Sequence, residues 1–411
     1  MKKIILTILK SALAAFLALS ASACNAKGFS TDQTYDRDYP VPVCDMSFFD
    51  SGYAIYGTPT GDGGVIEGYG LTCYVDYGTK TVVPRCSKPN CDHSGGDCAA
   101  SIECWCLLVY NNSFYRLYEV SEQTSNGDLK LYTAVAISEM DGTNEKTIAK
   151  IEGTVFGQSA APRESVMFVY DGKLYIYTVL EDFKDGVGSN YRKYKLYGIS
   201  LGSGQIDDLG LFSEGYSATC LLIGATEEKA YFRCRSRERE INSSDYETEE
   251  EYFAALEELE SIQKFISVSL TDGTTEEFDL PNMTYEHRIY GNCYYYSDSE
   301  GFYQLDLLNN TTEKIHDHTC GDLYYQTDDY LFFSCETEGQ DYIYDTKDKS
   351  VRAVPNCTDN FYFRPFKIKD GYCYGTAQLP EYEHVAVVVY CSEEDYFSNG
   401  DIELQMMQYK G

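Results

Sequence analysis

The sequence predicts an all-β fold, a β-propeller of about seven four-stranded antiparallel blades with one helical insertion. Strand-forming aromatic residues are abundant, with 39 Tyr and 20 Phe against 1 Trp and 10 Pro. Residues 166–212 read as strand, Asp-Gly turn, strand, loop, strand, Gly-Ser-Gly turn and strand, which makes one antiparallel unit. Similar units recur at roughly 30–60 residues up to the C-terminus, a period typical of propellers and arrays.

A ring of such units explains how each one buries its apolar surface. One unit alone cannot cover its own apolar faces, whereas neighbours in a closed ring cover each other. Many units contain a strand, a turn of the form S-x-x-D-G-T or a shortened version of it, and a second short strand. The pattern gives seven units, and six or eight would also fit. We therefore expect residues 44–411 to form a single propeller domain.

The N-terminus indicates export. Residues 1–23 begin with two lysines, continue as an apolar stretch interrupted by Lys10 and Ser11, and end in small residues before Cys24. This resembles a bacterial lipoprotein signal, which implies cleavage before Cys24 and a lipid on its sulfur. The alternative is an ordinary secretory signal beside an incidental cysteine. A retained transmembrane helix is less favoured, because the uninterrupted apolar run is too short to span a bilayer.

These features predict an extracytoplasmic protein on the outer face of the cell membrane, held there by lipid alone. Residues 24–43 are polar and are expected to be a flexible tether. Removal of residues 1–23 takes three lysines and changes the net charge from −32 to −35. A body this acidic repels nucleic acid and anionic lipid head groups, so both are excluded as partners.

Residues 244–265 interrupt the strand pattern and predict a helix inserted into the fourth unit. Ser244 and Glu247 match a capping box, and acidic residues fill the first turn. Apolar residues recur at helical spacing, namely Tyr252, Phe253, Leu256, Leu259 and Ile262. Two interpretations stay open: the apolar stripe packs on the propeller rim, or the helix is a docking site for a partner.

Sixteen cysteines in an exported chain suggest disulfides. Two pairs are equidistant from a predicted hairpin turn and would face each other across it, Cys220 with Cys234 and Cys320 with Cys335. The alternative is that many cysteines are buried free thiols that fill strand positions as small apolar residues. The scattered Cys293, Cys373 and Cys391 fit this alternative.

A separate cluster has the spacing C-x4-C-x-H-x4-C on a polar loop and consists of Cys86, Cys91, His93 and Cys98. Three thiolates and one imidazole are the ligands of a closed structural zinc site, although zinc knuckles commonly use C-x2-C. A disulfide knot is the other interpretation, with Cys104 and Cys106 as competing partners. In either case the cluster is expected to pin the crossover between the first and second units.

This loop, the signal and the repeat pattern together resemble a family of lipoproteins of Gram-positive anaerobes with TolB-like propellers. The resemblance implies a fold and a cellular address, and it transfers no catalytic residue. HExxH and G-x-S-x-G motifs and a glycine-rich phosphate loop are all missing from the sequence. The sequence therefore favours a binding or scaffolding module with a carbohydrate or protein ligand. The alternative is an envelope or glycan-acting hydrolase or lyase with acidic residues in the propeller channel.

Overall fold

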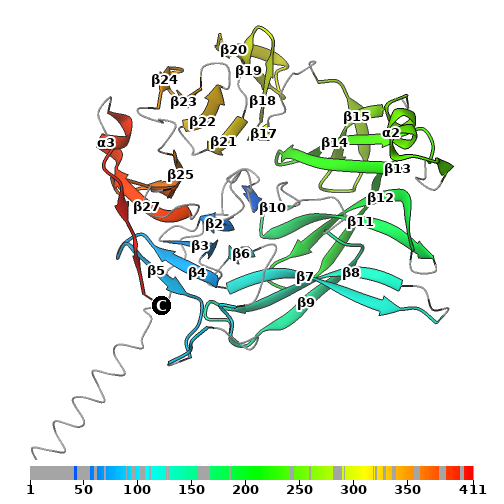
Figure 1. Cartoon of the computed structure of the whole chain (residues 1–411), viewed down its shortest axis with the longest axis horizontal. Helices are drawn as coiled ribbons and strands as arrows, with labels where there is room; N and C mark the ends of the chain where they lie inside the picture. The colour runs from blue at the N-terminus through cyan, green and yellow to red at the C-terminus, as the bar shows by residue number, and fades with distance from the viewer. Residues whose placement is uncertain are drawn as a thin grey trace, which may run out of the picture.

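The strands form a ring of blades around a central axis (Figure 1). The computed structural model of the chain describes residues 41–43, 56–59, 63–68, 71–88, 90–93, 98–101, 107–110, 113–125, 127, 129–155, 167–184, 187–240, 245–258, 261–280, 289–290, 292–317, 319, 322–326, 330–335, 339–354, 362–378, 386–398 and 402–410. The predictions for the signal, for lipidation at Cys24 and for Cys320 lie outside these residues. The described strands make seven four-stranded antiparallel units, which confirms the predicted all-β propeller.

The first four units are numbered as blades in chain order. Their strands are β2–β5 (Tyr56–Pro59, Gly63–Gly68, Leu71–Asp76, Thr81–Pro84), β6–β9 (Leu107–Tyr110, Ser113–Gln123, Leu129–Glu139, Lys146–Glu152), β10–β13 (Met167–Tyr170, Lys173–Lys184, Val187–Ser200, Ile206–Ala225) and β13–β16 (with Lys229–Arg237, Ser261–Ser269, Thr275–Phe278). Blades three and four share β13, whose residues 206–216 pair with β12 and residues 216–225 with β14. The two blades therefore form one continuous sheet of seven strands, and β1 extends it to eight.

Blades five to seven are separate sheets. Their strands are β17–β20 (Ile289–Tyr290, Cys293–Asp298, Gly301–Asp306, Thr311–His316), β21–β24 (Asp322–Gln326, Tyr330–Cys335, Gln340–Asp345, Val351–Ala353) and β25–β28 (Tyr362–Lys369, Tyr372–Gln378, Ala386–Ser392, Gln405–Met406). The central strands of blades two and three are much longer than the strands of blades five and six (Figure 1).

The two ends of the described chain both join the ring. After β28, strand β29 (Gln408–Tyr409) pairs in parallel with β5, so the C-terminal segment links blade seven to blade one. At the other end, β1 (Val41–Val43) pairs with β10, the first strand of blade three. Residues 41–43, the last three of the expected tether 24–43, are therefore part of a sheet. The sequence Val-Pro-Val suits an extended strand at the edge of that sheet.

Apolar clusters fill the seams between neighbouring blades. Tyr115 and Ile151 of blade two pack with Val169 and Ile176 of blade three. Comparable clusters join blades three to four, four to five, five to six, six to seven and seven to one. Full burial of one large apolar side chain stabilises a fold by about 1.5–3 kcal/mol. The stability of the ring therefore comes mainly from contacts between blades.

In blades three and four, a glycine in the turn before the outermost strand packs against the preceding blade. Gly204 and Gly273 have positive φ angles, and a Cβ on them would lie 2.4 Å from Ile148 O and 1.9 Å from Leu209 O. In each case the neighbour lies in the preceding blade. The D-G-T pattern in the sequence thus records a turn that only glycine fits, both by backbone conformation and by space.

The inserted helix is shorter than predicted. Helix α2 spans Glu249–Glu258, with Thr248 Oγ1 accepting a hydrogen bond from the backbone N–H of Glu251 at 3.2 Å. The expected helix 244–265 is wrong at its end, because residues 261–265 begin β15 and pair with β14. As a strand, residues 261–265 form backbone hydrogen bonds with β14, whereas the last turn of a helix would leave its carbonyl groups without partners in the protein.

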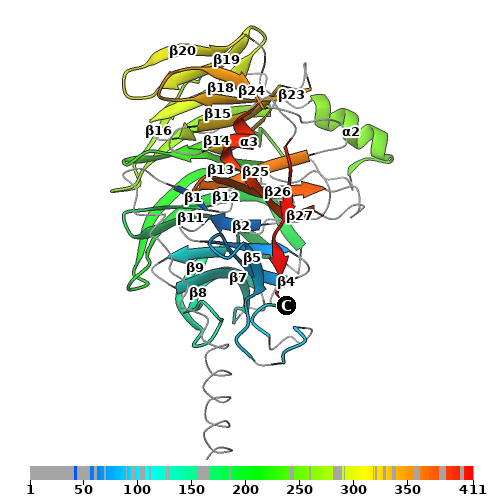
Figure 2. The ribbon, with the colours of Figure 1, turned by 90° about the vertical axis from the view of Figure 1, so that its left-hand side faces the viewer.

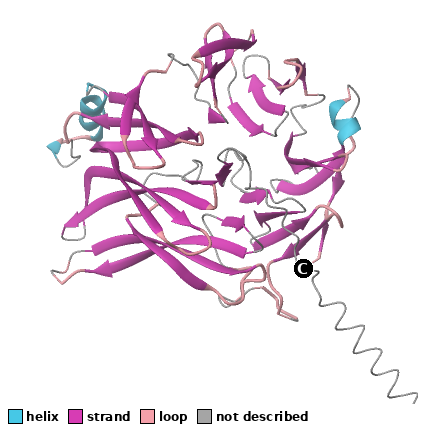
Figure 3. Ribbon diagram, turned by 180° about the vertical axis from the view of Figure 1, so that it is seen from behind, coloured by secondary structure: helices cyan, strands magenta, loops and turns pink. Residues whose placement is uncertain are grey.

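The helices lie at the edge of the ring. Figure 2 shows α2 projecting to one side of the stacked sheets, and its Phe253 is 56% exposed. The second described helix, α3 (Glu393–Phe397), begins at the cap Ser392 beside blade seven. Figure 3 shows how fully strands dominate the described chain. No helix among these residues has the length and apolar character needed to cross a membrane.

Candidate metal centre

The Cys/His cluster forms at the exit of blade one. Cys86 follows β5 directly, and Cys98 precedes the turn in which Ser101 donates to the backbone carbonyl of Cys98 through its N–H and its hydroxyl. The donor atoms of Cys86, Cys91, His93 and Cys98 all lie within 4.8 Å of one another. The four residues that the sequence singled out therefore converge on one point.

A left-handed backbone helps to close the loop. Asn90 and His93 have φ angles of 56° and 57°, a region that asparagine and histidine enter more readily than most residues. These two left-handed residues lie between Cys86 and Cys98, on either side of Cys91. The loop thus reaches its ligand geometry through two local backbone turns.

The electrostatics of the cluster favour a thiolate at Cys98. Burial raises the pKa of this thiol, but hydrogen bonds from His93, from the backbone at Ala100 and from Cys86 and Cys91 outweigh burial and lower the pKa to about 6. The Nδ1 atom of His93 lies 3.4 Å from Cys98 Sγ. At Cys86 burial raises the pKa to about 11, with Cys98 and Cys91 adding to the shift. Cys98 is therefore more readily ionised than Cys86.

This donor set suits one kind of metal chemistry. Cys86, Cys91 and Cys98 are free thiols in the structure, so three sulfurs and one ring nitrogen can face a single ion. Soft sulfur with imidazole selects zinc-like ions over magnesium or calcium, which prefer oxygen. Four protein ligands complete a tetrahedron and leave no position for water or substrate. Such a centre holds a loop in place and performs no hydrolysis.

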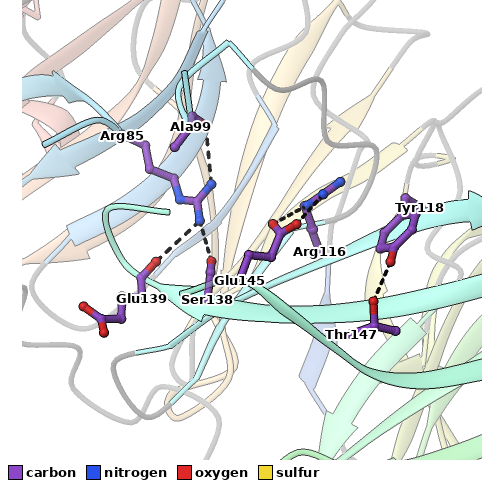
Figure 4. Close-up of polar contacts among 8 residues, drawn as sticks. All are labelled: Arg85, Ala99, Arg116, Tyr118, Ser138, Glu139, Glu145 and Thr147. Atoms are coloured by element: carbon purple, nitrogen blue, oxygen red, sulfur yellow. Dashed lines mark hydrogen bonds and ion pairs between the residues drawn. The ribbon is translucent and has the colours of Figure 1, made fainter. Parts of the chain in front are cut away.

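Arg85 fixes the base of this loop to blade two. Its side chain is buried, and it donates to the carbonyls of Met140 (3.1 Å) and Ala99 (3.4 Å) and to the Ser138 hydroxyl (2.7 Å). Its guanidinium also lies 3.5 Å from the centre of the Phe114 ring. Figure 4 shows the guanidinium between Ala99 at the end of the loop and Ser138 and Glu139 at the end of β8.

The turn between β8 and β9 of blade two contacts the Cys/His loop. A Cβ on Gly142 would lie 2.2 Å from the Cβ of Ala99, so the turn and the loop are packed directly against each other. In the other two glycine turns the partner is a strand of the preceding blade, whereas here it is the end of the Cys/His loop. Asp141 accepts a hydrogen bond from the Ser87 side chain at the other end of the loop. The loop therefore occupies the seam between blades one and two.

The structure also places the other residues that the sequence singled out. Cys220 and Cys234 are directly opposed in the register of β13 and β14, both are buried, and their sulfurs lie 2.7 Å apart. Cys335 is buried in β22, while its expected partner Cys320 lies outside the described residues.

Sequence reasoning missed one pair. Cys373 of β26 and Cys391 of β27 are directly opposed, and both are buried. The structure has both as buried free thiols, which fits the alternative that the sequence favours for them, but their direct opposition is not predicted. A signal was present, because the two cysteines are equidistant from the polar stretch around Tyr382, as Cys220 and Cys234 are from their turn. The longer connection hid this symmetry.

Comparison with known proteins gives structural matches alone. No protein-family model matches the chain, and no curated protein is similar to it in sequence. An oligogalacturonate lyase in complex with manganese shares 11% identity at a TM-score of 0.39, over 71% of this chain and 84% of that one. TolB from Acinetobacter baumannii shares 13% at 0.33, over 71% and 69%. Dipeptidyl peptidase 4 from Porphyromonas gingivalis shares 10% at 0.41, over 86% and 53%, so this chain spans about half of that protein.

The names of these proteins assign no activity to this chain, and the resemblance to lipoproteins stays a prediction. Fold class follows from the strand pairing itself. The fold and the cluster together define a β-propeller with a Cys/His loop between its first two blades, in which four donor atoms lie close enough together to hold a metal ion.

Proposed function

We propose that this protein is a lipid-anchored, extracytoplasmic β-propeller that acts as a binding or scaffolding module, with a structural zinc ion in the Cys/His loop. The observation that carries the proposal is the convergence of four protein ligands within 4.8 Å, in a loop docked on blade two. A metal ion bound by four protein ligands would make the loop rigid. A rigid ring that presents loops at its ends is how propellers commonly bind ligands.

The identity of the ion follows from its ligands. Three cysteines and one histidine suit tetrahedral Zn²⁺, which has no redox chemistry that would consume the thiolates. Zinc would replace the proton that Cys86 retains and neutralise the charge at Cys98. The loop would then be fixed to blade one by Cys86 and to blade two through Arg85 and Ala99. We therefore propose that zinc holds blades one and two together where they meet.

The ligand class is proposed from composition. The chain is strongly acidic, which disfavours nucleic acid and anionic membrane surfaces. Loops rich in Tyr, Asp and Asn offer stacking faces and hydrogen bonds, which suit carbohydrate or protein ligands. We therefore propose a neutral or cationic glycan or protein of the cell envelope as the ligand.

Retention without turnover is the result expected of a binding module. The mature protein is immobilised and exposed to fractionated envelope polysaccharides and envelope proteins, and both retention and depletion of each fraction are measured. Specific retention with no new reducing ends, unsaturated sugars or peptide fragments supports the proposal. Catalytic depletion of any fraction would instead establish the hydrolase or lyase alternative. A heat-unfolded sample controls for charge-driven adsorption.

Anchoring is tested separately. The full chain and its Cys24→Ala variant are expressed in a bacterium, and each is followed by membrane fractionation and by mass analysis of the N-terminal peptide. We expect a lipid-modified peptide and membrane association for the native chain alone. If both proteins partition equally and carry no lipid, residues 1–23 act as an ordinary secretory signal. Disulfides at Cys220–Cys234 and Cys320–Cys335 belong to the same proposal of an exported protein.

A further inference from the structure

The strongest unexplained feature outside the metal centre is the pair Cys373 and Cys391. They are Cα partners in the antiparallel pairing of β26 with β27, and their side chains are 0% and 2% exposed. Directly opposed residues place their Cβ atoms about 4.5–5.5 Å apart, close to the distance that a disulfide spans. Both lie in the apolar cluster between blades six and seven, beside Phe363 and Tyr396.

Blade seven is the blade on which the ring closes. Tyr374, next to Cys373, donates its hydroxyl hydrogen to the carbonyl of Tyr77 in blade one at 3.0 Å. Strand β27 holds β28, and the backbone N–H of Met407 donates to Val388 O at 3.0 Å. The chain then continues directly into β29 against β5. Any bond between β26 and β27 therefore braces the strands that carry the closure.

We propose that Cys373 and Cys391 form a disulfide bond that ties β26 to β27 and locks the closing blade. The oxidant is a small-molecule or protein disulfide outside the cytoplasm. One cysteine thiolate attacks this disulfide and releases one thiolate; the other cysteine then attacks the mixed disulfide and releases the second. The cysteine sulfurs lose two electrons, the oxidant gains both, and the two cysteine protons pass through solvent to the released thiolates.

The exchange takes place before blade seven is packed. In the folded ring both sulfurs are shielded from a disulfide reagent, and contact with Cys391 together with burial holds the pKa of Cys373 far above its usual range. The folded thiols are therefore poor nucleophiles. A bond made while β27 is still open becomes sealed into the core when Phe363 and Tyr396 close over it. This inference is independent of the zinc proposal.

The bond is tested on the full chain exported from a bacterium. The protein is unfolded in a thiol-alkylating reagent without reductant, digested and analysed by mass spectrometry. We expect a peptide pair linked through Cys373 and Cys391, which separates on reduction. Alkyl label on both residues in the exported protein overturns the proposal. Cys73 is the internal control, since its register partners in β3 and β5 are Ile66 and Pro84.

The locking role needs a second measurement. The proteins are unfolded in a phosphine reductant, which can then reach the sulfurs, and refolded in it; this treatment is expected to lower the Tm of the exported wild type by about 4 °C more than that of the double variant Cys373→Ala/Cys391→Ala. Cys73→Ala, which removes a buried strand thiol elsewhere, should keep the wild-type response. Equal responses of wild type and double variant would show that the bond does not lock the blade. The peptide mapping stays decisive even if the double variant fails to fold.

Discussion

Arg85 shows how much of this seam depends on one side chain. Its buried guanidinium satisfies carbonyls from the loop and from blade two, and it covers the Phe114 ring. Hydrogen bonds of a charged donor to buried carbonyls are worth more than neutral ones, and removing the donor leaves those carbonyls unpaired. Arg116, also drawn in Figure 4, makes instead a two-point ion pair with Glu145 nearer the surface.

We predict that Arg85→Ala lowers the free energy of unfolding by about 3 kcal/mol, through lost hydrogen bonds and the lost contact with Phe114. Arg116→Ala, the matched control, should cost about 1 kcal/mol or less. Denaturant unfolding of both variants measures the difference. Similar values for the two would mean that the loop does not depend on Arg85.

Asp141 gives the same seam a pH dependence. Burial raises its pKa, but hydrogen bonds from Thr143 and Ser87 and the charge of Arg85 outweigh burial, so its pKa lies below the ordinary aspartate value. A lowered pKa in the folded state means that the ionised form stabilises the fold above the ordinary value. That contribution is lost as the pH falls through the folded-state pKa.

We therefore predict that Asp141→Asn is less stable than the wild type at neutral pH and that the gap closes in acid. The measurement is the stability difference between the two proteins from pH 7 down to about pH 3. Any effect of acid on the Cys/His cluster is common to both proteins, so the stability difference between them removes it. A gap that stays constant or widens in acid would contradict the assignment.

The glycine turns show which parts of a blade face its neighbour. Gly142 and Gly371 both follow an aspartate in a tight turn, with φ angles of 82° and 78°. A Cβ on Gly371 would meet nothing within 4 Å, whereas one on Gly142 would overlap Ala99 of the Cys/His loop. The two glycines therefore have the same backbone conformation, and they differ in whether another segment lies next to the turn.

Gly371→Ala is predicted to destabilise the protein by about 1 kcal/mol, the cost of a left-handed alanine. Gly142→Ala should cost about 1–3 kcal/mol more, because the loop must also move away. Thermal unfolding of both variants gives this comparison. If both lose the same stability, the contact between turn and loop contributes nothing.

The sequence predicted regular elements well where turn chemistry marks them. Asp171 and Gly172 both have positive φ angles, as the Asp-Gly turn of the template unit predicts. The inserted helix was predicted too long, because Ile262 and Phe265 fit the spacing of a helix and of a strand equally well. Pairing with β14 decided between them, and pairing is a contact that no local pattern records.

At the level of the ring, the sequence predicted about seven blades and singled out the four residues of the Cys/His cluster, but it did not predict how the ring closes. The repeated turns predict the number of blades. The boundary between blades three and four is not visible in the sequence, because β13 belongs to both. Parallel pairing of β29 with β5 joins residues from opposite ends of the chain. The role of Arg85 was missed for the same reason, since its partners lie in the next blade.

We predict one bound zinc ion per chain, and we expect that ion to hold blades one and two together. Four ligands within 4.8 Å, on a loop seated against Ala99 and Gly142, are the basis for this claim. Removal of the ion should free the loop and expose the seam. Cys98→Ser is the matched variant, because it removes one thiolate and keeps a similar volume.

The most direct test is elemental analysis of the purified full chain, followed by thermal unfolding with and without a chelator. We expect about one zinc per wild-type chain, a marked loss in Cys98→Ser, and a Tm that the chelator lowers only in the wild type. Less than about half a zinc per chain, with the cluster cysteines resistant to alkylation until reduced, would contradict the account and show a disulfide knot in its place.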